Sequence, residues 1–352
     1  MMLLKPSFIA ADRLYGVVGV ACSPRIGCFK DAQRVGRPTL GAWVTYALGT
    51  QNRNLPGYVV LADPKGFQVD GIKNWSSGWL PAIYQGTPLR SEGSPLFDLD
   101  PPERLKRKPT LRQAQLELLT ALNERHRREL PHLTELEARI ANFELGANIR
   151  ETVVAAMDTA QESIETHRLY GTDQKETAAY GARCLMARRL LERGVRFVSV
   201  FNDLIMGDPW DTHFQHNARI QVVAKNVDRP CAALISDLKR RGMLDDTLVI
   251  WAGEFGRLPV AQGKDGRDHN RHAFTILLAG GGVKAGLTYG RTDDFGYKIQ
   301  ENLLSINNLQ ATILHLLGLD HEELTYRYSG RDESLTDAEV TKAQVVDELL
   351  AT

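Results

Sequence analysis

Apolar runs and amphipathic stretches alternate along much of the chain. Short apolar runs bounded by glycine, proline or polar residues predict strands at 57–63, 195–201, 247–252 and 274–279. Apolar residues at helical spacing predict helices at 38–48, 182–191, 214–241 and 307–317. Strands that alternate with helices are typical of an α/β fold whose sheet is mostly parallel.

Several regions depart from this pattern. Residues 1–35 carry no clear period, although residues 15–21 are apolar enough for a short strand. Residues 65–110 are rich in glycine, proline and serine and predict a long ordered loop region. Residues 111–168 predict a solvated helical insertion, with a second helix at about 133–150. The chain therefore divides into an N-terminal segment, an α/β domain and a polar C-terminal tail that we expect to be helical, at 1–35, 36–335 and 336–352.

The charge balance excludes some classes of partner. The chain has 43 basic and 43 acidic side chains, so nothing global points to nucleic acid or a membrane surface. No apolar run is long enough to span a membrane, and the first residues lack the pattern of a secretory signal, so we expect a cytoplasmic protein. The cysteines are too few for a disulfide scaffold and predict free thiols (Cys22, Cys28, Cys184 and Cys231).

The first candidate for chemistry is an Asp-x-His pair. Asp211 and His213 follow the strand predicted at 195–201. On a loop, this pair can place a carboxylate oxygen and an imidazole nitrogen on one cation. Mixed ligands of this kind suit zinc or manganese better than calcium, which prefers oxygen. The structural alternative is a hydrogen-bonded turn.

Two further charged groups follow the strand predicted at 247–252. Glu254 and Arg257 come directly after the strand. The second group, in the next loop, is formed by Arg267, Asp268 and His269. In open α/β sheets, chemistry gathers at the carboxyl ends of the strands, so we expect these groups to converge with Asp211 and His213 on a metal or anion site. Ion pairs and helix caps are the structural alternative.

Short motifs surround these residues. Five lie in the second half of the chain, namely Trp210-Asp-Thr-His213, Gly253-Glu-Phe-Gly-Arg257, Gly266-Arg-Asp-His269, Ala279-Gly-Gly-Gly282 and Thr325-Tyr-Arg-Tyr-Ser-Gly-Arg331. Three lie upstream, namely Gly36-Arg-Pro-Thr-Leu-Gly-Ala-Trp43, Leu55-Pro-Gly-Tyr-Val-Val60 and Trp75-Ser-Ser-Gly-Trp-Leu-Pro81. Together they resemble the bacterial family called domain of unknown function 1501 (DUF1501), over roughly residues 34 to 335. That sulfatase-like family is similar to the alkaline phosphatase superfamily.

This resemblance carries expectations about fold and chemistry. It implies a three-layer, mostly parallel sheet between helices, as in alkaline phosphatases, and a hydrolase of small sulfate or phosphate esters, such as those of a carbohydrate. It also implies a divalent ion (zinc, manganese or calcium) held by Asp211, His213, Glu254, Asp268 and His269. Arg257 and Arg267 would stabilise the anionic oxygens. Phe255 stands where relatives carry the second residue of a ligand pair, so this ligand is missing.

The start of the chain departs from the family pattern. Relatives begin with an export signal and a first strand that supplies a metal-binding Asp and leads to the nucleophile. The first 33 residues do not match this pattern, and Cys22-Ser-Pro-Arg25 lacks one residue of the sulfatase motif Cys-x-Pro-x-Arg. We therefore expect a domain truncated at its N-terminus, with an exposed sheet edge. An active hydrolase, a non-catalytic metal- or ligand-binding remnant, and an isomerase or mutase on the same scaffold are all compatible with the sequence.

Overall fold

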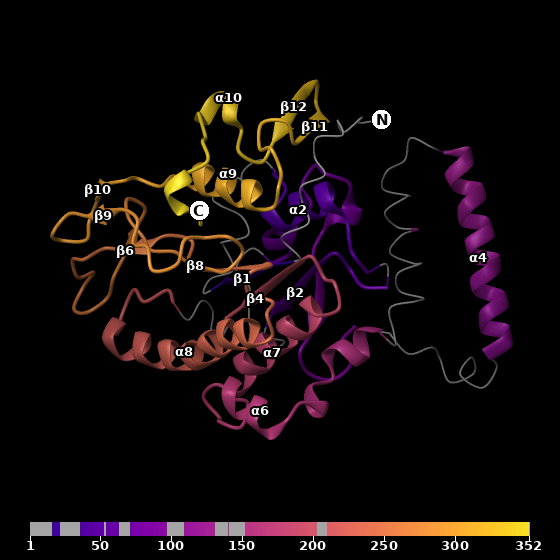
Figure 1. The fold of residues 1–352 in the computed structure, drawn as a ribbon, viewed down its shortest axis with the longest axis horizontal. Helices are drawn as coiled ribbons and strands as arrows, with labels where there is room; N and C mark the ends of the chain where they lie inside the picture. Colours follow the sequence, from indigo (N-terminus) through magenta and orange to yellow (C-terminus); the bar gives the residue numbers. More distant parts are fainter. Residues whose placement is uncertain are drawn as a thin grey trace.

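The fold is built on one mixed sheet. The computed structural model describes residues 16–21, 36–52, 54–62, 71–96, 109–130, 140, 152–202 and 210–351. Its sheet has the order β3-β2-β4-β1-β5-β8 (Figure 1), formed by Thr87–Arg90, Tyr58–Ala62, Phe197–Phe201, Gly16–Ala21, Thr247–Ala252 and Leu277–Ala279. The first five strands of this order are parallel, and β8 is antiparallel to β5. The prediction of an α/β fold with a mostly parallel sheet is confirmed.

Helices pack on both faces of the sheet. Val198, Val200 and Val249 face the cluster that includes α7 (Ala178–Leu191) and α8 (His216–Arg240). The alternate residues of the same strands face the opposite cluster, which includes α2 (Leu40–Leu48) and α9 (Ile306–Leu316). Because both faces are covered, strands β2, β4 and β5 are mostly apolar, which is why short apolar runs located them. All four predicted helices occur, with ends shifted by a few residues.

Strand β1 corrects the expectation of a missing first strand. It lies in the middle of the sheet, where Val18 pairs with Val198 of β4 on one side and Val249 of β5 on the other. The predicted exposed edge at this position is therefore wrong. Its partners lie far along the chain, so no local pattern could place it. The motif Cys22-Ser-Pro-Arg25 lies outside the described residues.

A second correction concerns the region predicted as loop at 65–110. It contains the edge strand β3 and two short 3₁₀ helices, η3 (Gly71–Trp75) and η4 (Ala82–Tyr84). Proline is tolerated on an edge strand, where its missing N–H weakens no central ladder. The sequence did not predict β3 because it contains Pro88, and a proline within an apolar run argues against a strand.

The predicted insertion is helical where it is described. Helix α4 (Pro109–Glu129) stands apart from the sheet in Figure 1, and most of its described side chains are exposed. Residues 152–157 are helical, and α6 (Ile164–Tyr170) follows. Of the second predicted helix, at about 133–150, only Ile140 is described, and it is helical. No helix in the described ranges is both long and apolar enough to cross a membrane.

The end of the chain is packed rather than a solvated helix. Strands β11 (Thr325–Tyr328) and β12 (Arg331–Ser334) form a hairpin. After them only α10 (Ala338–Thr341) and the 3₁₀ turn η6 (Asp347–Leu349) are helical, so the prediction of a helical tail is wrong for most of its length. Ala343, Val346 and Leu349 are buried, and the Val346 N–H donates to the Thr312 hydroxyl of α9 at 3.0 Å. The apolar residues of this tail are interspersed with polar ones, and the contact between Val346 and α9 depends on a partner distant in the sequence, so the local pattern did not predict this packing.

Candidate metal centre

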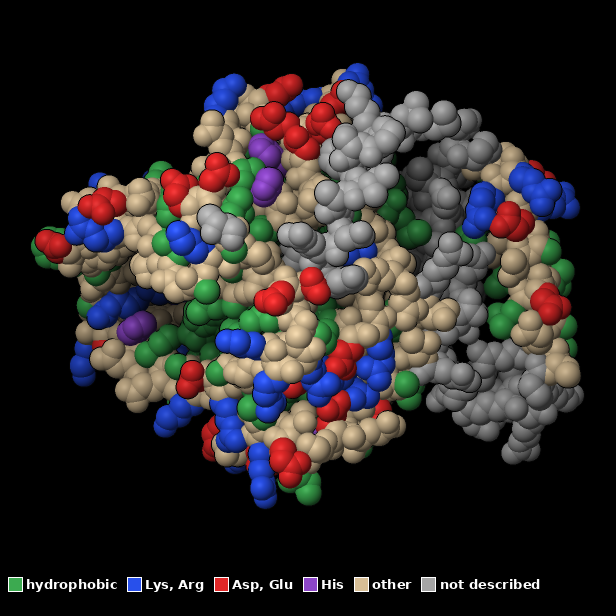
Figure 2. Space-filling model, in the orientation of Figure 1, with side chains coloured by type: hydrophobic (Ala, Val, Ile, Leu, Met, Phe, Trp, Pro, Cys, Tyr) green, Lys and Arg blue, Asp and Glu red, His purple; other side chains and the backbone are tan. Residues whose placement is uncertain are grey.

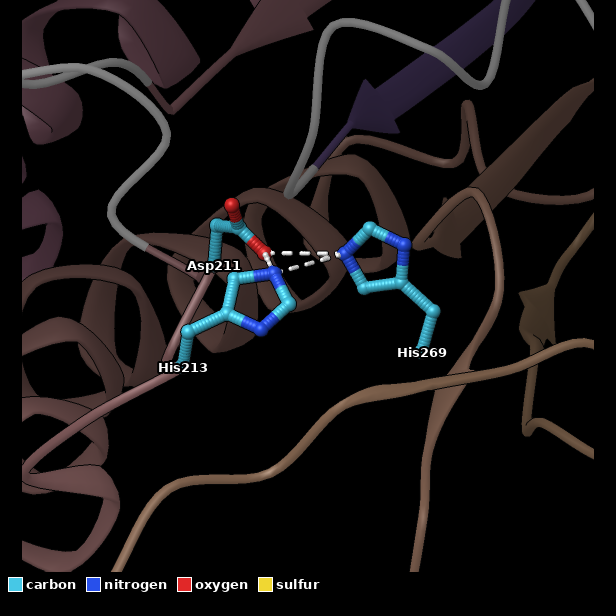
Figure 3. A group of neighbouring side chains, drawn as sticks. All are labelled: Asp211, His213 and His269. Carbon is cyan, nitrogen blue, oxygen red and sulfur yellow. Dashed lines mark hydrogen bonds and ion pairs between the residues drawn. The ribbon is translucent and has the colours of Figure 1, made fainter. Parts of the chain in front are cut away.

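The candidate site lies beyond the carboxyl ends of β4 and β5. Asp211 and His213 belong to the segment that leads into α8, and His269 lies in β7 (His269–Asn270). Figure 3 shows the two imidazole rings pointing at one Asp211 carboxylate oxygen from different sides. Chain segments that are separate in sequence thus meet at this edge of the sheet, as the strand-end argument predicts.

A small antiparallel ladder sets the position of His269. Strand β6 (Gly256–Arg257) pairs with β7 so that Arg257 lies opposite His269. Directly opposed residues of an antiparallel pair have neighbouring side chains, so the register places the Arg257 guanidinium beside the imidazole. The ladder continues through the Leu258 N–H, which donates to the Asp268 carbonyl at 2.8 Å.

The segment carrying His213 is held against the same loop. The Arg267 N–H donates to the Thr212 carbonyl at 2.9 Å. A Cβ on Gly266 would lie 1.9 Å from the His213 carbonyl oxygen, so only glycine permits this approach of the two backbones. Gly266 therefore brings His213 close enough to share a site with His269.

Three ligand atoms converge in the cluster formed by Asp211, His213 and His269. The Asp211 Oδ1 lies 3.0 Å from the His213 Nε2 and 3.0 Å from the His269 Nε2. The two Nε2 atoms are 3.1 Å apart. Zinc bonds of 2.0–2.1 Å in a tetrahedron separate ligand atoms by about 3.3–3.4 Å, so this triangle is within a few tenths of an ångström of a zinc-binding face.

A neighbouring amide determines which nitrogen of His213 is available. The His213 Nδ1 lies 2.6 Å from the Gln262 Oε1, an acceptor, so the proton of a neutral ring is on Nδ1. The Nε2 then presents a lone pair to the Asp211 Oδ1, which is also an acceptor. Two acceptors at 3.0 Å repel unless a cation or a proton lies between them. No sequence pattern pointed to Gln262, because glutamine is common in polar loops.

Arg257 completes the charge around Asp211. Its Nη1 lies 2.7 Å from the Asp211 Oδ1. Burial by itself raises the pKa of the Asp211 carboxyl, but hydrogen bonds from His269 and Arg257 outweigh it, and the pKa lies below its usual value. The Phe255 ring packs on the His269 imidazole, with 4.2 Å between ring centroids. Phe255 therefore helps to orient the His269 ring.

The other predicted ligands lie nearby but outside the cluster. The Asp268 Oδ1 accepts the His269 N–H at 2.7 Å and is 3.9 Å from the His213 Nδ1. Glu254 lines the adjoining cavity of about 470 Å³ together with Arg257. The Arg267 guanidinium donates to the Gly266 carbonyl at 2.9 Å and is absent from the cavity lining. The structure thus brings together three of the five predicted ligands and one of the two arginines.

His216 is a further imidazole on this cavity. Its Nδ1 lies 2.7 Å from the Thr212 Oγ1. Burial lowers the pKa of His216, and the positive charges of Arg267 and Arg257 lower it further, so the ring is neutral at physiological pH. The cavity therefore combines a neutral imidazole with positive charge.

Comparison with known proteins identifies the family. The family model described as "Protein of unknown function (DUF1501)" matches residues 24–350. The chain belongs to the DUF1501 family. Among curated proteins and among solved structures, nothing matches. The matched range extends beyond the motifs that first indicated the resemblance and contains every residue of the candidate site.

The donor set of this DUF1501 protein fits one divalent metal ion. Among the described residues, the cluster of Asp211, His213 and His269 is the group whose ligand atoms all lie within 4.8 Å of one another. Two imidazoles and one carboxylate form a common facial set for zinc or iron, and the remaining coordination positions stay open to water or substrate. The side chains are about one-third exposed, so a ligand can reach them.

Proposed function

We propose that this protein is a metal-dependent hydrolase of small sulfate or phosphate esters. The observation that carries the proposal is the triangle of ligand atoms from Asp211, His213 and His269, with sides of 3.0, 3.0 and 3.1 Å. The motif resemblance to sulfatase-like proteins and to the alkaline phosphatase superfamily supports the choice of ester. We extend that resemblance to the fold, as a parallel sheet layered between helices.

The ligand types favour particular metals. Two imidazole nitrogens favour zinc or manganese over calcium, which prefers oxygen ligands. When bound, such an ion supplies a Lewis acid for the ester oxygens and activates water at neutral pH. Gln262 and Asp268 would orient the ligands from outside, as hydrogen-bond partners of metal-binding residues do.

Arg257 is suited to hold the anionic group of the substrate. Its guanidinium is a planar fork of donors that matches sulfate or phosphate oxygens, and it lines the cavity beside the cluster. Charge that develops on these oxygens during attack would be stabilised by the same donors. Arg267 adds positive charge to this side of the cavity without lining it.

Glu254 is suited to move the proton. Its carboxylate lines the same cavity, and no described residue forms a hydrogen bond or ion pair with it. In hydrolysis, water forms the new bond to phosphorus or sulfur while the bond to the ester oxygen breaks. Glu254 would accept the proton of the attacking water, and the leaving alkoxide would take up a proton.

A non-catalytic metal-binding protein is the second candidate. The Thr212 hydroxyl, which lies between two of the ligands in sequence, is fully buried and bonded to His216, so it is not placed to attack a substrate. A protein that binds the ion without catalysis is compatible with this arrangement of Thr212. In the hydrolase proposal, water acts as the nucleophile.

Turnover of chromogenic esters separates the two. We expect the zinc- or manganese-loaded protein to hydrolyse 4-nitrophenyl phosphate or 4-nitrophenyl sulfate. Removal of the metal and the His269→Ala variant should each abolish turnover, whereas His315→Ala, an exposed histidine on α9, should leave it unchanged. Turnover that survives metal removal would contradict the proposal. Stoichiometric metal without turnover of either ester would establish the non-catalytic alternative.

A further inference from the structure

An apolar hollow adjoins the candidate metal centre. It has a volume of about 580 Å³, and its lining includes Trp210, Trp251, Val227, Ile235, Ala224 and Ala232. Figure 2 shows hydrophobic side chains gathered in a hollow between α8 and β8, close to a histidine and to basic side chains. Among the described residues, charged side chains enter the lining only at Lys225 and Asp228.

The hollow and the polar cavity share a wall. Trp210 and Trp251 line both, and their rings meet edge to face with centroids 6.3 Å apart. Trp210 directly precedes the ligand Asp211, and Trp251 is in β5, just before Glu254. An ester whose anionic group lies against Arg257 therefore has two aromatic rings beside its organic group.

Small side chains on α8 keep the hollow open. Ala224 and Ala232 are exposed in its lining, so larger apolar residues at these positions would fill it. On the other side, β8 has only three residues. A contiguous apolar surface that is left open beside a polar site is typical of a binding site rather than of the scaffold.

We propose that the hollow binds an aromatic group of the substrate, so that the ester at the metal centre is an aryl sulfate or aryl phosphate. This inference rests on the proposed function. Aromatic rings stack well against tryptophan in edge-to-face or offset arrangements, which the Trp210–Trp251 pair offers. Within the described part of the lining, the hydroxyl groups of a sugar would find charged partners only at Lys225 and Asp228.

The test uses matched anions that cannot be hydrolysed. The metal-loaded protein is titrated with naphthalene-2-sulfonate and methanesulfonate, and separately with naphthylmethylphosphonate and methylphosphonate. In the series that matches the true ester, we expect the naphthyl compound to bind about tenfold more tightly or better, since its apolar surface leaves water. The two series distinguish a sulfate site from a phosphate site.

Variants on one helix locate the binding. Ala224→Phe and Ala232→Phe fill the hollow and should remove the preference for the naphthyl compounds, with no change for the methyl compounds. Val222→Phe is the matched control, since Val222 is an exposed residue of α8 outside the lining. Equal affinity for naphthyl and methyl compounds, or a preference that survives Ala224→Phe and Ala232→Phe, would overturn the inference.

A failure of the proposed function has a different signature. Arg257→Ala should lower the affinity for both the methyl and the naphthyl compounds, because both would place their anionic group on Arg257. Arg257→Ala and metal removal could leave the affinities for both compounds unchanged while Ala224→Phe still removes the preference for the naphthyl compound. That result would contradict the proposed anion site at the metal centre and would support the aromatic site.

Discussion

Two clusters of charged and titratable side chains in this protein have opposite characters. The first, the buried ionic network, is centred on Arg188 of α7, whose side chain is 1% exposed. Its guanidinium contacts Glu162 at 2.8 Å, Glu192 at 2.7 Å and Asp237 at 3.2 Å. Asp237 also accepts the Tyr170 hydroxyl at 3.1 Å. Cations and carboxylates are in mutual contact here, and the network ties α7 to α8.

The second, the candidate metal centre, is more open, and Arg257 contacts the Asp211 Oδ1 there at 2.7 Å. Asp211, His213 and His269 are each about one-third exposed, and their ligand atoms face one another. In the buried ionic network three carboxylates contact one shared guanidinium, whereas at the candidate metal centre two imidazole nitrogens converge on one carboxylate oxygen, as ligands do around a metal ion. The difference lies in how the partners are arranged, since both clusters contain acidic and basic side chains.

Substitution within the buried ionic network should destabilise the protein most. Arg188→Met leaves three carboxylates without their common cation and should lower the free energy of unfolding by about 3–5 kcal/mol. Arg257→Met should cost about 1 kcal/mol or less, because its partner Asp211 is more than one-third exposed to water. Denaturant unfolding of the metal-free proteins measures both. Similar losses for the two variants would contradict the distinction between the clusters.

The next effect concerns the orientation of a ligand. Gln262→Leu removes the acceptor that keeps the His213 proton on Nδ1, so metal affinity should fall by about 10–100-fold. Gln262→Glu keeps an acceptor oxygen at the same position and should retain most of the affinity. Isothermal titration calorimetry measures the zinc affinity of the wild type and both variants. Equal affinities for the wild type and Gln262→Leu would show that Gln262 does not orient His213 for metal binding.

The smallest effect is a pH dependence of the buried ionic network. Burial alone would raise the pKa of Glu162, but hydrogen bonds and charges from Arg188 and Arg189 outweigh it and lower the pKa below 4.5. A lowered pKa in the folded state means that the stabilisation is complete above the unfolded value and is lost as the pH falls through the folded value. The difference in unfolding free energy between wild type and Glu162→Gln should therefore be constant near neutral pH and shrink below about pH 4.5. A difference that grows on acidification is the contrary outcome.

Local patterns explain which parts of the fold were predictable. Strands β2, β4 and β5 are short apolar runs with clear boundaries, and helices α7 and α8 carry helical spacing, so each was evident in the sequence. The central position of β1 depends on partners that are distant in the chain. No pattern within six residues can specify such partners, so residues 15–21 predicted only a short strand. The expectation of a missing first strand came from the family pattern, which residues 1–33 did not match.

The same limit applies to the candidate site. Asp211, His213 and His269 were found because residues that can ligate metals follow predicted strands. The exclusion of Glu254 from the cluster depends on the course of the chain between β5 and β6, and the contribution of Gln262 depends on an approach between two loops. The apolar hollow could not be predicted for another reason. It is lined by Ala224 and Ala232, and alanine on an exposed helix face is common in a sequence.

The metal content of the purified protein decides whether Asp211, His213 and His269 form a metal site. The purified protein is incubated with zinc or manganese, freed of unbound ions and analysed for metal per chain, alongside His213→Ala, His269→Ala and His315→Ala. We predict about one ion per chain in the wild type and in His315→Ala, and almost none in the other two variants. A wild type without stoichiometric metal, or equal metal in all four proteins, would show that the cluster is an ordinary group of hydrogen-bonded side chains.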